Sequence, residues 1–249
     1  MGWPRSPKGA GAATSAVLLC ALLLLFGCSG SKVTTQASKE LPRYQVRTIA
    51  LAPFSALSTP QVADSGDPFL SGPQSVRRSD ITLGTPPVGE PALQQTVTVP
   101  PHAAEKVTQL FWNRLKGHKQ LLIVEPGQTG KALSGAEGDP RSVTPESRAA
   151  AAAKTLKADA VLIGQVRIYQ ERVGSRLGAD PPASVGFEVK TVAADGQVLW
   201  VGNYYERQKP MNQDFLGFFQ HGAGFVTAEE LAAYGVQEVL KQFPFGAEE

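Results

Sequence analysis

The chain has 249 residues, of which 42% are hydrophobic and 18% are charged, a composition typical of a globular protein and not of a disordered chain. Its two cysteines, Cys20 and Cys28, lie in the first 28 residues, so the rest of the chain can form neither a disulfide nor a thiolate metal site. Removal of the residues before Cys28 would leave 22 basic and 22 acidic residues, and a neutral chain without a basic stripe argues against nucleic acid as a partner.

The amino-terminal segment combines a basic start with a short apolar run. Arg5 and Lys8 precede an uninterrupted apolar run of 12 residues, 16–27. A membrane-spanning helix needs about 20 residues, whereas the core of an export signal needs roughly 7–15. The run is too short to span a membrane, and it predicts a signal peptide over residues 1–27.

The end of this run resembles the lipobox of bacterial lipoproteins. Residues 25–28 (LFGC) have the leucine and the cysteine of that motif, with Phe26 bulkier than the residue usual at its position. The resemblance implies that the Cys28 thiol is alkylated with diacylglycerol, that residues 1–27 are removed and that the new amino terminus is acylated. Ser29 stands where enterobacterial lipoproteins of the inner membrane carry aspartate, which implies a periplasm-facing anchor in the outer membrane. An ordinary signal peptide with a chance cysteine, or an uncleaved short anchor, is the alternative.

Two polar stretches interrupt the apolar pattern of the remaining chain. Residues 29–42 are rich in Ser, Thr and Lys, and we expect residues 28–43 to be the lipidated cysteine and a flexible tether with an average reach of ~20 Å. Residues 55–101 hold eight prolines and no sustained hydrophobic period. Because so long a loop is uncommon in a compact domain, we expect a flexible insertion there, with short strands as the alternative at residues 81–83 and 97–99.

The first half of the domain reads as alternating strands and helices. Strands are expected over residues 44–53 and 121–124, and apolar residues at helical spacing predict a helix over residues 102–116 between them. A second helix begins at Thr144, an N-cap followed by Pro145 at the first helical position, and ends near Leu156.

The second half predicts an antiparallel meander and a last helix. Strands are expected over residues 160–171, 184–192 and 198–205, and Asp195-Gly196 is a strong hairpin signal. Thr227 and Glu230 form a capping box at the start of the last helix. The order strand, helix, strand, helix, three strands, helix predicts one α/β (α+β) domain over residues 44–245, with a mixed sheet and helices packed on it.

One segment shares part of the pattern of a nucleotide-binding P-loop. Residues 125–132 (EPGQTGKA) follow a strand and contain a Gly-Lys pair, but Glu125 stands where the motif needs glycine and Ala132 where it needs Ser or Thr. We also expect the glycines and proline over residues 135–140 to prevent the helix that such a loop opens. The segment therefore predicts a polar turn and no nucleotide.

Catalytic and metal-binding patterns are missing from the sequence. The three histidines, His102, His118 and His221, have no second His, Cys or acidic residue at metal-ligand spacing. There is no Gly-x-Ser-x-Gly elbow, and the one cysteine of the mature chain is assigned to lipid. We expect a protein that is not an enzyme and that has no cofactor and no metal.

Two groups of residues remain that the predicted core does not require. Residues 215–225 carry four phenylalanines and three glycines, which either fold back onto the sheet or form an apolar loop for a partner or a membrane. In the last three predicted strands, the side chains at outward-facing alternate positions form either a solvated face or a face of polar and aromatic residues that binds a partner. The candidate partner-binding residues are Phe215, Phe218, Phe219, His221, Phe225, Tyr169 and Tyr205.

Three phrases of the sequence, residues 49–54 (IALAPF), 156–164 (LKADAVLIG) and 195–200 (DGQVLW), resemble a group of envelope lipoprotein domains. The group includes the amino-terminal domain of TolB, the curli secretion lipoprotein CsgG and the lipoprotein activator of a penicillin-binding protein. The resemblance implies a lipid-anchored module that binds an envelope protein or associates with itself. The alternative is a subunit of a CsgG-like oligomeric secretion channel, whose membrane hairpin the insertion is long enough to hold, although its prolines argue against strands.

Overall fold

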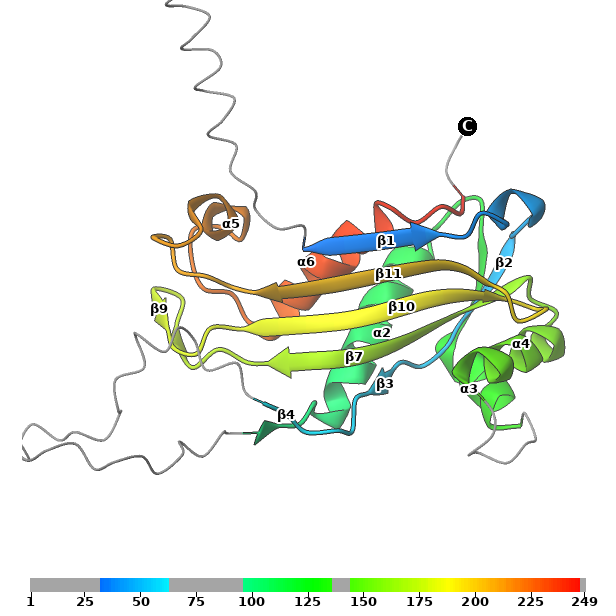
Figure 1. The fold of residues 1–249 in the computed structure, drawn as a ribbon, viewed down its shortest axis with the longest axis horizontal. Helices are drawn as coiled ribbons and strands as arrows, with labels where there is room; N and C mark the ends of the chain where they lie inside the picture. The colour runs from blue at the N-terminus through cyan, green and yellow to red at the C-terminus, as the bar shows by residue number, and fades with distance from the viewer. Residues whose placement is uncertain (1–31, 63–95, 136–143, 247–249) are drawn as a thin grey trace, which may run out of the picture. The chain divides into compact units, whose positions relative to one another are not determined.

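The computed structural model describes residues 32–62, 96–135 and 144–246 (Figure 1). They form a single α/β domain in which helices pack on a mixed seven-stranded sheet. Six strands lie in the order β1-β11-β10-β7-β2-β6, and β3 pairs with β7 beside this path. The predicted fold class is confirmed.

The sheet is parallel around β2. There β2 pairs with β6 on one side and with β7 on the other, and β3 continues the pairing with β7. The chain crosses from β2 to β6 through α2, and from β6 to β7 through α3 and α4. These elements are β2 (Thr48–Leu51), β3 (Ser55–Ala56), α2 (Pro101–Leu115), β6 (Leu122–Val124), α3 (Pro126–Ser134), α4 (Pro145–Leu156) and β7 (Ala160–Gln170).

The other half of the sheet is antiparallel. β10 (Ser184–Ala193) pairs with β7 and with β11 (Val198–Arg207), and β1 (Val33–Ala37) adds an edge strand to β11. The turn between β10 and β11 is formed by Asp195 and Gly196, and Gly196 has a φ of 95°, which only glycine adopts without strain. The chain ends in α6 (Ala228–Leu240), whose Thr227–Glu230 capping box is present as predicted.

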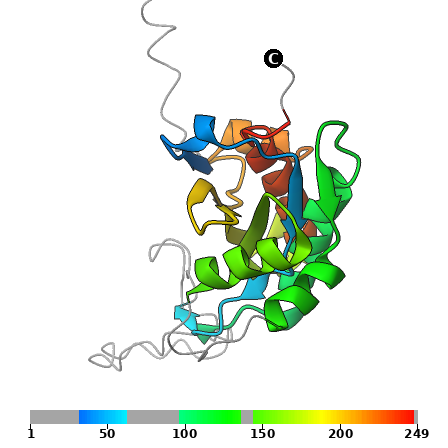
Figure 2. The same ribbon diagram turned by 90° about the vertical axis from the view of Figure 1, so that its right-hand side faces the viewer.

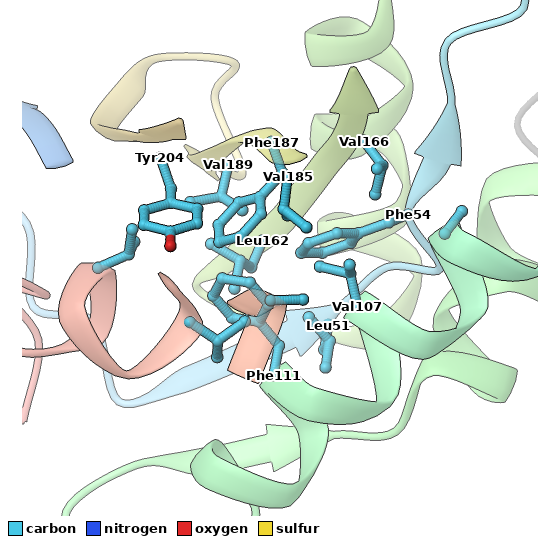
Figure 3. Packing of buried hydrophobic residues seen from close by; sticks show 14 of the residues in the cluster. Leu51, Phe54, Val107, Phe111, Leu162, Val166, Val185, Phe187, Val189 and Tyr204 are labelled. Atoms are coloured by element: carbon cyan, nitrogen blue, oxygen red, sulfur yellow. The ribbon is translucent and has the colours of Figure 1, made fainter. Parts of the chain in front are cut away.

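The larger core lies between the sheet and the helices α2 and α6 (Figure 3). A row of aromatic rings crosses it, with centroid distances of 5.0 Å from Phe54 to Phe111, 5.7 Å from Phe111 to Phe187 and 5.3 Å from Phe187 to Tyr204. These side chains come from the turn after β2, from α2, from β10 and from β11. The row therefore joins the parallel and antiparallel halves into one packed unit.

A smaller core of short side chains lies on the other face of the sheet. It joins Ala149, Ala152 and Ala153 of α4 to Ala50 of β2 and Val161 of β7, so α4 lies close to the strands. On this face α3 contacts β2, and α4 contacts β7 and β10 at one end of the long strands (Figures 1 and 2). Toward the opposite end of the long strands, the described residues place no helix on this face (Figure 1).

The expected tether over residues 28–43 is wrong from Lys32 onward. Val33–Ala37 is the strand β1, which pairs with five residues of β11, and Leu41–Arg43 is a 3-10 helix, η1. An edge strand needs few apolar residues, because only one of its faces is buried and only one of its edges is paired. In β1 the buried apolar side chain is that of Val33. The folded domain thus begins at Lys32, while residues 1–31, with the predicted signal peptide and Cys28, lie outside the described residues.

The polar turn expected at residues 125–132 is also wrong, because residues 126–134 form the helix α3. Pro126 occupies its first turn and Gly135 its C-cap, positions at which proline and glycine are compatible with a helix. The residues expected to prevent a helix therefore lie at its end or beyond it.

The insertion over residues 55–101 is described only at its two ends. There β4 (Gln61–Val62) pairs antiparallel with β5 (Thr96–Val97), and Val99 is buried. The strand expected at residues 81–83 lies outside the described residues. A second short hairpin, β8 (Gly174–Ser175) with β9 (Gly178–Ala179), connects β7 to β10. None of the helices that the structure describes is long and apolar enough to cross a membrane.

Candidate functional site

The phenylalanine-rich segment forms a short helix, α5 (Phe215–Gln220). The Asp214 carboxylate caps it by accepting a hydrogen bond of 2.8 Å from the Gly217 N–H. The rings of Phe215 and Phe219 lie 4.7 Å apart and are 60% and 51% exposed. Phe218 instead contacts Phe225, which is buried. The segment therefore both folds back onto the domain and leaves two aromatic rings on the surface.

His221, which follows α5, is not a surface residue. Its Nε2 lies 2.8 Å from Glu206 Oε1, and both side chains are about 5% exposed or less. The same carboxylate is 2.8 Å from Lys32 Nζ and accepts a hydrogen bond of 2.6 Å from the Tyr204 hydroxyl. The cluster joins the start of β1, the end of β11 and the loop after α5, so His221 holds the structure together and is not available to a partner.

The electrostatics of this cluster fix Glu206 as an anion. Burial acts to raise the pKa of Glu206, but hydrogen bonds from His221, Lys32 and Tyr204 outweigh it and hold the pKa below its ordinary value. Burial, followed by the charge of Glu206, raises the pKa of Tyr204. A carboxylate that is ionised and surrounded by donors is a poor general base.

Two polar residues that sequence reasoning missed organise this end of the domain. Glu206 is one; the other is Gln208, whose amide donates to the Gly224 carbonyl at 2.7 Å and accepts from the Val226 N–H at 2.8 Å. Glu206 and Gln208 continue the series of alternate, inward-facing residues of β11 to which the buried Tyr204 belongs. A polar residue that continues an apolar alternation is the signal that indicates such a buried network.

Tyr169 faces the core and not the solvent, so its assignment to an outward binding face is wrong. It is 7% exposed and meets the His102 ring edge-on at 6.2 Å. Burial, and then the charges of two glutamates, raise its pKa to about 12. The cause is a bulge: Val166 pairs with Phe187 and Ile168 with Gly186, so Arg167 is an extra residue and the alternation of β7 reverses after it.

Tyr205 does lie on the uncovered side of the sheet, where it is 47% exposed. A chain of ion pairs crosses the same side: Arg167 Nη2 is 2.6 Å from Glu188 Oε2, and Lys190 Nζ is 3.3 Å from Glu188 Oε1 and 2.9 Å from Glu146 Oε1. The Lys190–Glu146 hydrogen bond raises the pKa of Lys190 and lowers that of Glu146. We call this side, with Gln165, Arg167, Glu188, Lys190 and Tyr205, the open face.

A hollow of about 310 Å³ lies where the open face meets α4. It is located just beyond the carboxyl end of β2. The chain leaves β2 for α2 on one face of the sheet and leaves the neighbouring strand β6 for α3 and α4 on the other. Ligands of open α/β sheets bind at such switch points. Its lining includes Pro53, Leu133, Ile163 and Gly164, with Glu146, Arg148, Glu188 and Lys190 as charged groups.

The large apolar side chains that remain exposed are not spread evenly. Seven are exposed among the described residues, and six of them belong to segments at the end of the sheet where β1 begins. The hairpin β8–β9 packs there on the loop after α5, since the Phe225 N–H donates to the Arg176 carbonyl at 2.8 Å. We call this set the apolar end; its members are Val173, Leu177, Tyr205, Met211, Phe215 and Phe219.

The described residues hold no group of three or more His, Cys, Asp or Glu side chains that could bind a metal ion. Of the seven candidate partner-binding residues, the structure brings Phe215, Phe219 and Tyr205 to the surface. Phe218 is partly buried, and Tyr169, His221 and Phe225 have buried side chains that position others.

No family model matches the chain, and no curated protein matches it. Among solved structures it is similar to the PelC dodecamer from Paraburkholderia phytofirmans, with 14% identity, coverage of 87% of this chain and 98% of that chain, and a TM-score of 0.43. It is similar to the LpoB C-terminal domain from Salmonella enterica, with 13% identity, coverage of 66% and 84%, and a TM-score of 0.33. It is also similar to the lipoprotein GNA1162 from Neisseria meningitidis, with 13% identity, coverage of 79% and 96%, and a TM-score of 0.33.

A lipoprotein is thus among the structures to which this chain is similar. At 14% identity or less and TM-scores of 0.43 or less, the likeness carries no argument about function. What this chain binds can be inferred only from its own residues.

Proposed function

We propose that this chain is a lipoprotein anchored in the outer membrane through acyl chains on Cys28, and that it binds an envelope protein on its periplasmic side without catalysing a reaction. The lipobox at residues 25–28 supports the anchor. The observation that carries the binding role is the hollow on the open face, between α4 and the strands β7 and β10.

The hollow has the composition of a site for a protein segment. Its apolar lining fits an apolar side chain of the partner, and its charged groups of both signs fit polar groups beside that side chain. The ion pairs of Lys190 with Glu146 and Glu188 hold these groups in place before the partner arrives, which reduces the ordering cost of binding.

The same contacts support a role that is not enzymatic. Both carboxylates of the hollow are paired with Lys190, and the pKa of Glu146 is lowered and not raised. General acids and bases have a pKa near the working pH, and a lowered carboxyl pKa moves Glu146 away from it.

In-cell photocrosslinking tests the binding role. A photoreactive residue is placed at Arg167, which is 49% exposed and pairs with Glu188 of the hollow. In a second variant it is placed at Lys154, which is exposed on α4 outside the hollow. We expect a discrete envelope-protein adduct from position 167 and none from position 154. Equal labelling from both positions, or adducts from neither, would contradict a partner on the open face.

The anchor is tested separately by Cys28→Ala. The unmodified chain should incorporate labelled palmitate and fractionate with the outer membrane, whereas the variant should do neither. A variant that keeps its lipid label and its membrane fraction would show that Cys28 is not the attachment point.

A further inference from the structure

We infer that the apolar end is a membrane-docking surface, and that the phenylalanines of α5 enter the interface of the bilayer that holds the acyl chains of Cys28. This inference rests on the lipidation proposed above and adds a second, non-covalent contact with the same membrane. It assigns the apolar end, which includes Tyr205 at the edge of the open face, to lipid and leaves the hollow to the protein partner.

The first step is the composition of the apolar end. It gathers six of the seven exposed large apolar side chains in the described part of the chain. They come from the hairpin β8–β9 and the residue before it, from the end of β11 and the turn that follows, and from α5. The tip residue Leu177 is 92% exposed, and α5 itself contains no charged residue. Apolar patches of this kind mark contacts with proteins or membranes, and phenylalanine and leucine are typical of the buried side of interfacial helices.

The second step is the distance to the anchor. The Lys32 carbonyl accepts a hydrogen bond of 3.0 Å from the Tyr205 N–H, and Lys32 Nζ lies 3.3 Å from Gln220 Oε1 at the end of α5. Cys28 is four residues before Lys32, and four residues span at most about 14 Å. A lipidated Cys28 therefore keeps α5 within reach of the bilayer surface.

The third step is the rigidity of the presentation. Phe215 and Phe219 are exposed on a helix that is fixed by the Asp214 cap and by the contact of Phe218 with Phe225. The loop after α5 is tied to β11 by Glu206–His221 and by both hydrogen bonds of Gln208. The exposed rings are held in an orientation that their neighbours determine, so docking requires no rearrangement of α5.

The choice of lipid over protein follows from the position of the surface. Acyl chains on Cys28 would be confined to the bilayer, and Lys32, close to them in the chain, contacts Gln220 at the end of α5. The hollow, in contrast, is lined by residues of the turn after β2, of α3 and α4 and of the strands β7 and β10, and shares none of them with the apolar end.

Fluorescence of the lipidated full chain on vesicles tests the inference. The protein is purified in detergent and reconstituted into vesicles of phosphatidylethanolamine and phosphatidylglycerol. Since the mature chain has one cysteine and lipid occupies it, a new cysteine can be labelled alone with an environment-sensitive dye. The labelled variants are Phe219→Cys and Leu177→Cys at the apolar end, with Leu122→Cys, a 68% exposed leucine of β6, as the matched control.

We expect the dye at positions 219 and 177 to shift its emission to the blue on vesicles and to be quenched by lipids brominated in their acyl chains. The dye at position 122 should behave as in water. If labels at 219 and 177 behave like the label at 122 while the protein floats with the vesicles, the docking inference is wrong and the apolar end is left to a protein partner. A chain that does not float with vesicles contradicts the lipid anchor itself.

Discussion

At the scale of single residues, the threonines Thr108 and Thr191 are both buried but differ in the surroundings of their hydroxyl groups. The Thr108 hydroxyl accepts a hydrogen bond from the Phe54 N–H at 2.9 Å and donates one to the Ala104 carbonyl at 2.7 Å. The Thr191 hydroxyl has no hydrogen-bond partner among the residues that the structure describes. A buried polar group without a partner costs stability, whereas a paired one does not.

The same substitution should therefore have opposite effects at the two sites. Thr191→Val removes an unpaired hydroxyl at nearly constant volume and should stabilise the domain by about 1 kcal/mol. Thr108→Val leaves the Phe54 N–H unpaired and should destabilise it by about 1–3 kcal/mol. Urea unfolding of both variants measures the two changes, and a loss of stability in Thr191→Val would show that its hydroxyl is paired after all.

Glu206 determines the second prediction at this scale. Glu206→Gln removes the charge that faces Lys32 inside the cluster, and breaking a buried ion pair in this way should lower the free energy of unfolding by about 3 kcal/mol. The control is Glu238→Gln, whose partner Lys241 is 58% exposed, and which should change it by about 0.5 kcal/mol or less. Equal effects of the two substitutions would mean that burial adds nothing to the Glu206 pair.

The pH dependence of unfolding separates the charge from the packing. Because the pKa of Glu206 is lower in the folded protein than its ordinary value, its contribution is present above the ordinary pKa of a glutamate and is lost as the pH falls through the lowered value. The unmodified protein should therefore lose more stability than Glu206→Gln between pH 7 and about pH 3. Identical pH profiles would contradict the lowered pKa.

At the scale of elements, β1 is held to the sheet by the backbone of alternate residues. The Lys32 carbonyl and the Ser38 N–H bond to β11, and Gln36 lies opposite Val201. In an antiparallel ladder the alternation places the Gln36 N–H toward β11 and the Ala37 N–H toward the free edge.

Proline at these two neighbours should therefore act differently. Gln36→Pro removes a ladder bond and should destabilise the domain by about 1–3 kcal/mol, whereas Ala37→Pro removes an N–H that faces away from the ladder and should cost less. Both substitutions restrict φ in the same way, so the difference between their free energies of unfolding reports the loss of the ladder hydrogen bond. Amide exchange of β11 gives an independent readout, since only Gln36→Pro should speed it. Equal protection in the two variants would mean that β1 is not paired in this register.

The elements with a strong hydrophobic period were predictable from the sequence, and those without one were not. In these elements the buried side chains recur at helix or strand spacing within the element's own sequence, so the core face can be read locally. The elements are α2, α4, α6 and the long strands β7, β10 and β11. β1 has one buried apolar side chain, and its pairing with β11 joins residues nearly 170 positions apart. No local pattern contains that information, because the partner strand provides the stabilisation.

The candidate site was predictable only in part for a related reason. The phenylalanines of α5 were singled out by composition, but which rings face outward depends on the packing of Phe218 on Phe225. The error at Tyr169 came from one extra residue at the bulge, which reverses the side of every residue after it. The hollow could not be predicted without the crossover topology, because its lining comes from separate segments between residues 52 and 190.

At the scale of the whole molecule, two surfaces with different chemistry are placed on different parts of one domain. The apolar end lies where β1 begins, and the hollow lies beside α4 near the other end of the long strands. A module that binds one partner does not need a closed ring of copies. The lipidated chain extracted in detergent should therefore sediment as a species of one or a few copies. A ring of many copies would favour the channel subunit over the binding module.

The pairing of β1 also has a mechanical consequence. If Cys28 carries the proposed acyl chains, a pull on them reaches the fold first at Lys32, whose carbonyl is bonded to the Tyr205 N–H. A pull along β1 then lies across the hydrogen bonds to β11. The ladder is then sheared, with its bonds resisting together, and is not unzipped one bond at a time. Since β11 is the second strand of the sheet, the force would spread into the centre of the sheet, and the proposed anchor would transmit both tension and orientation to the domain.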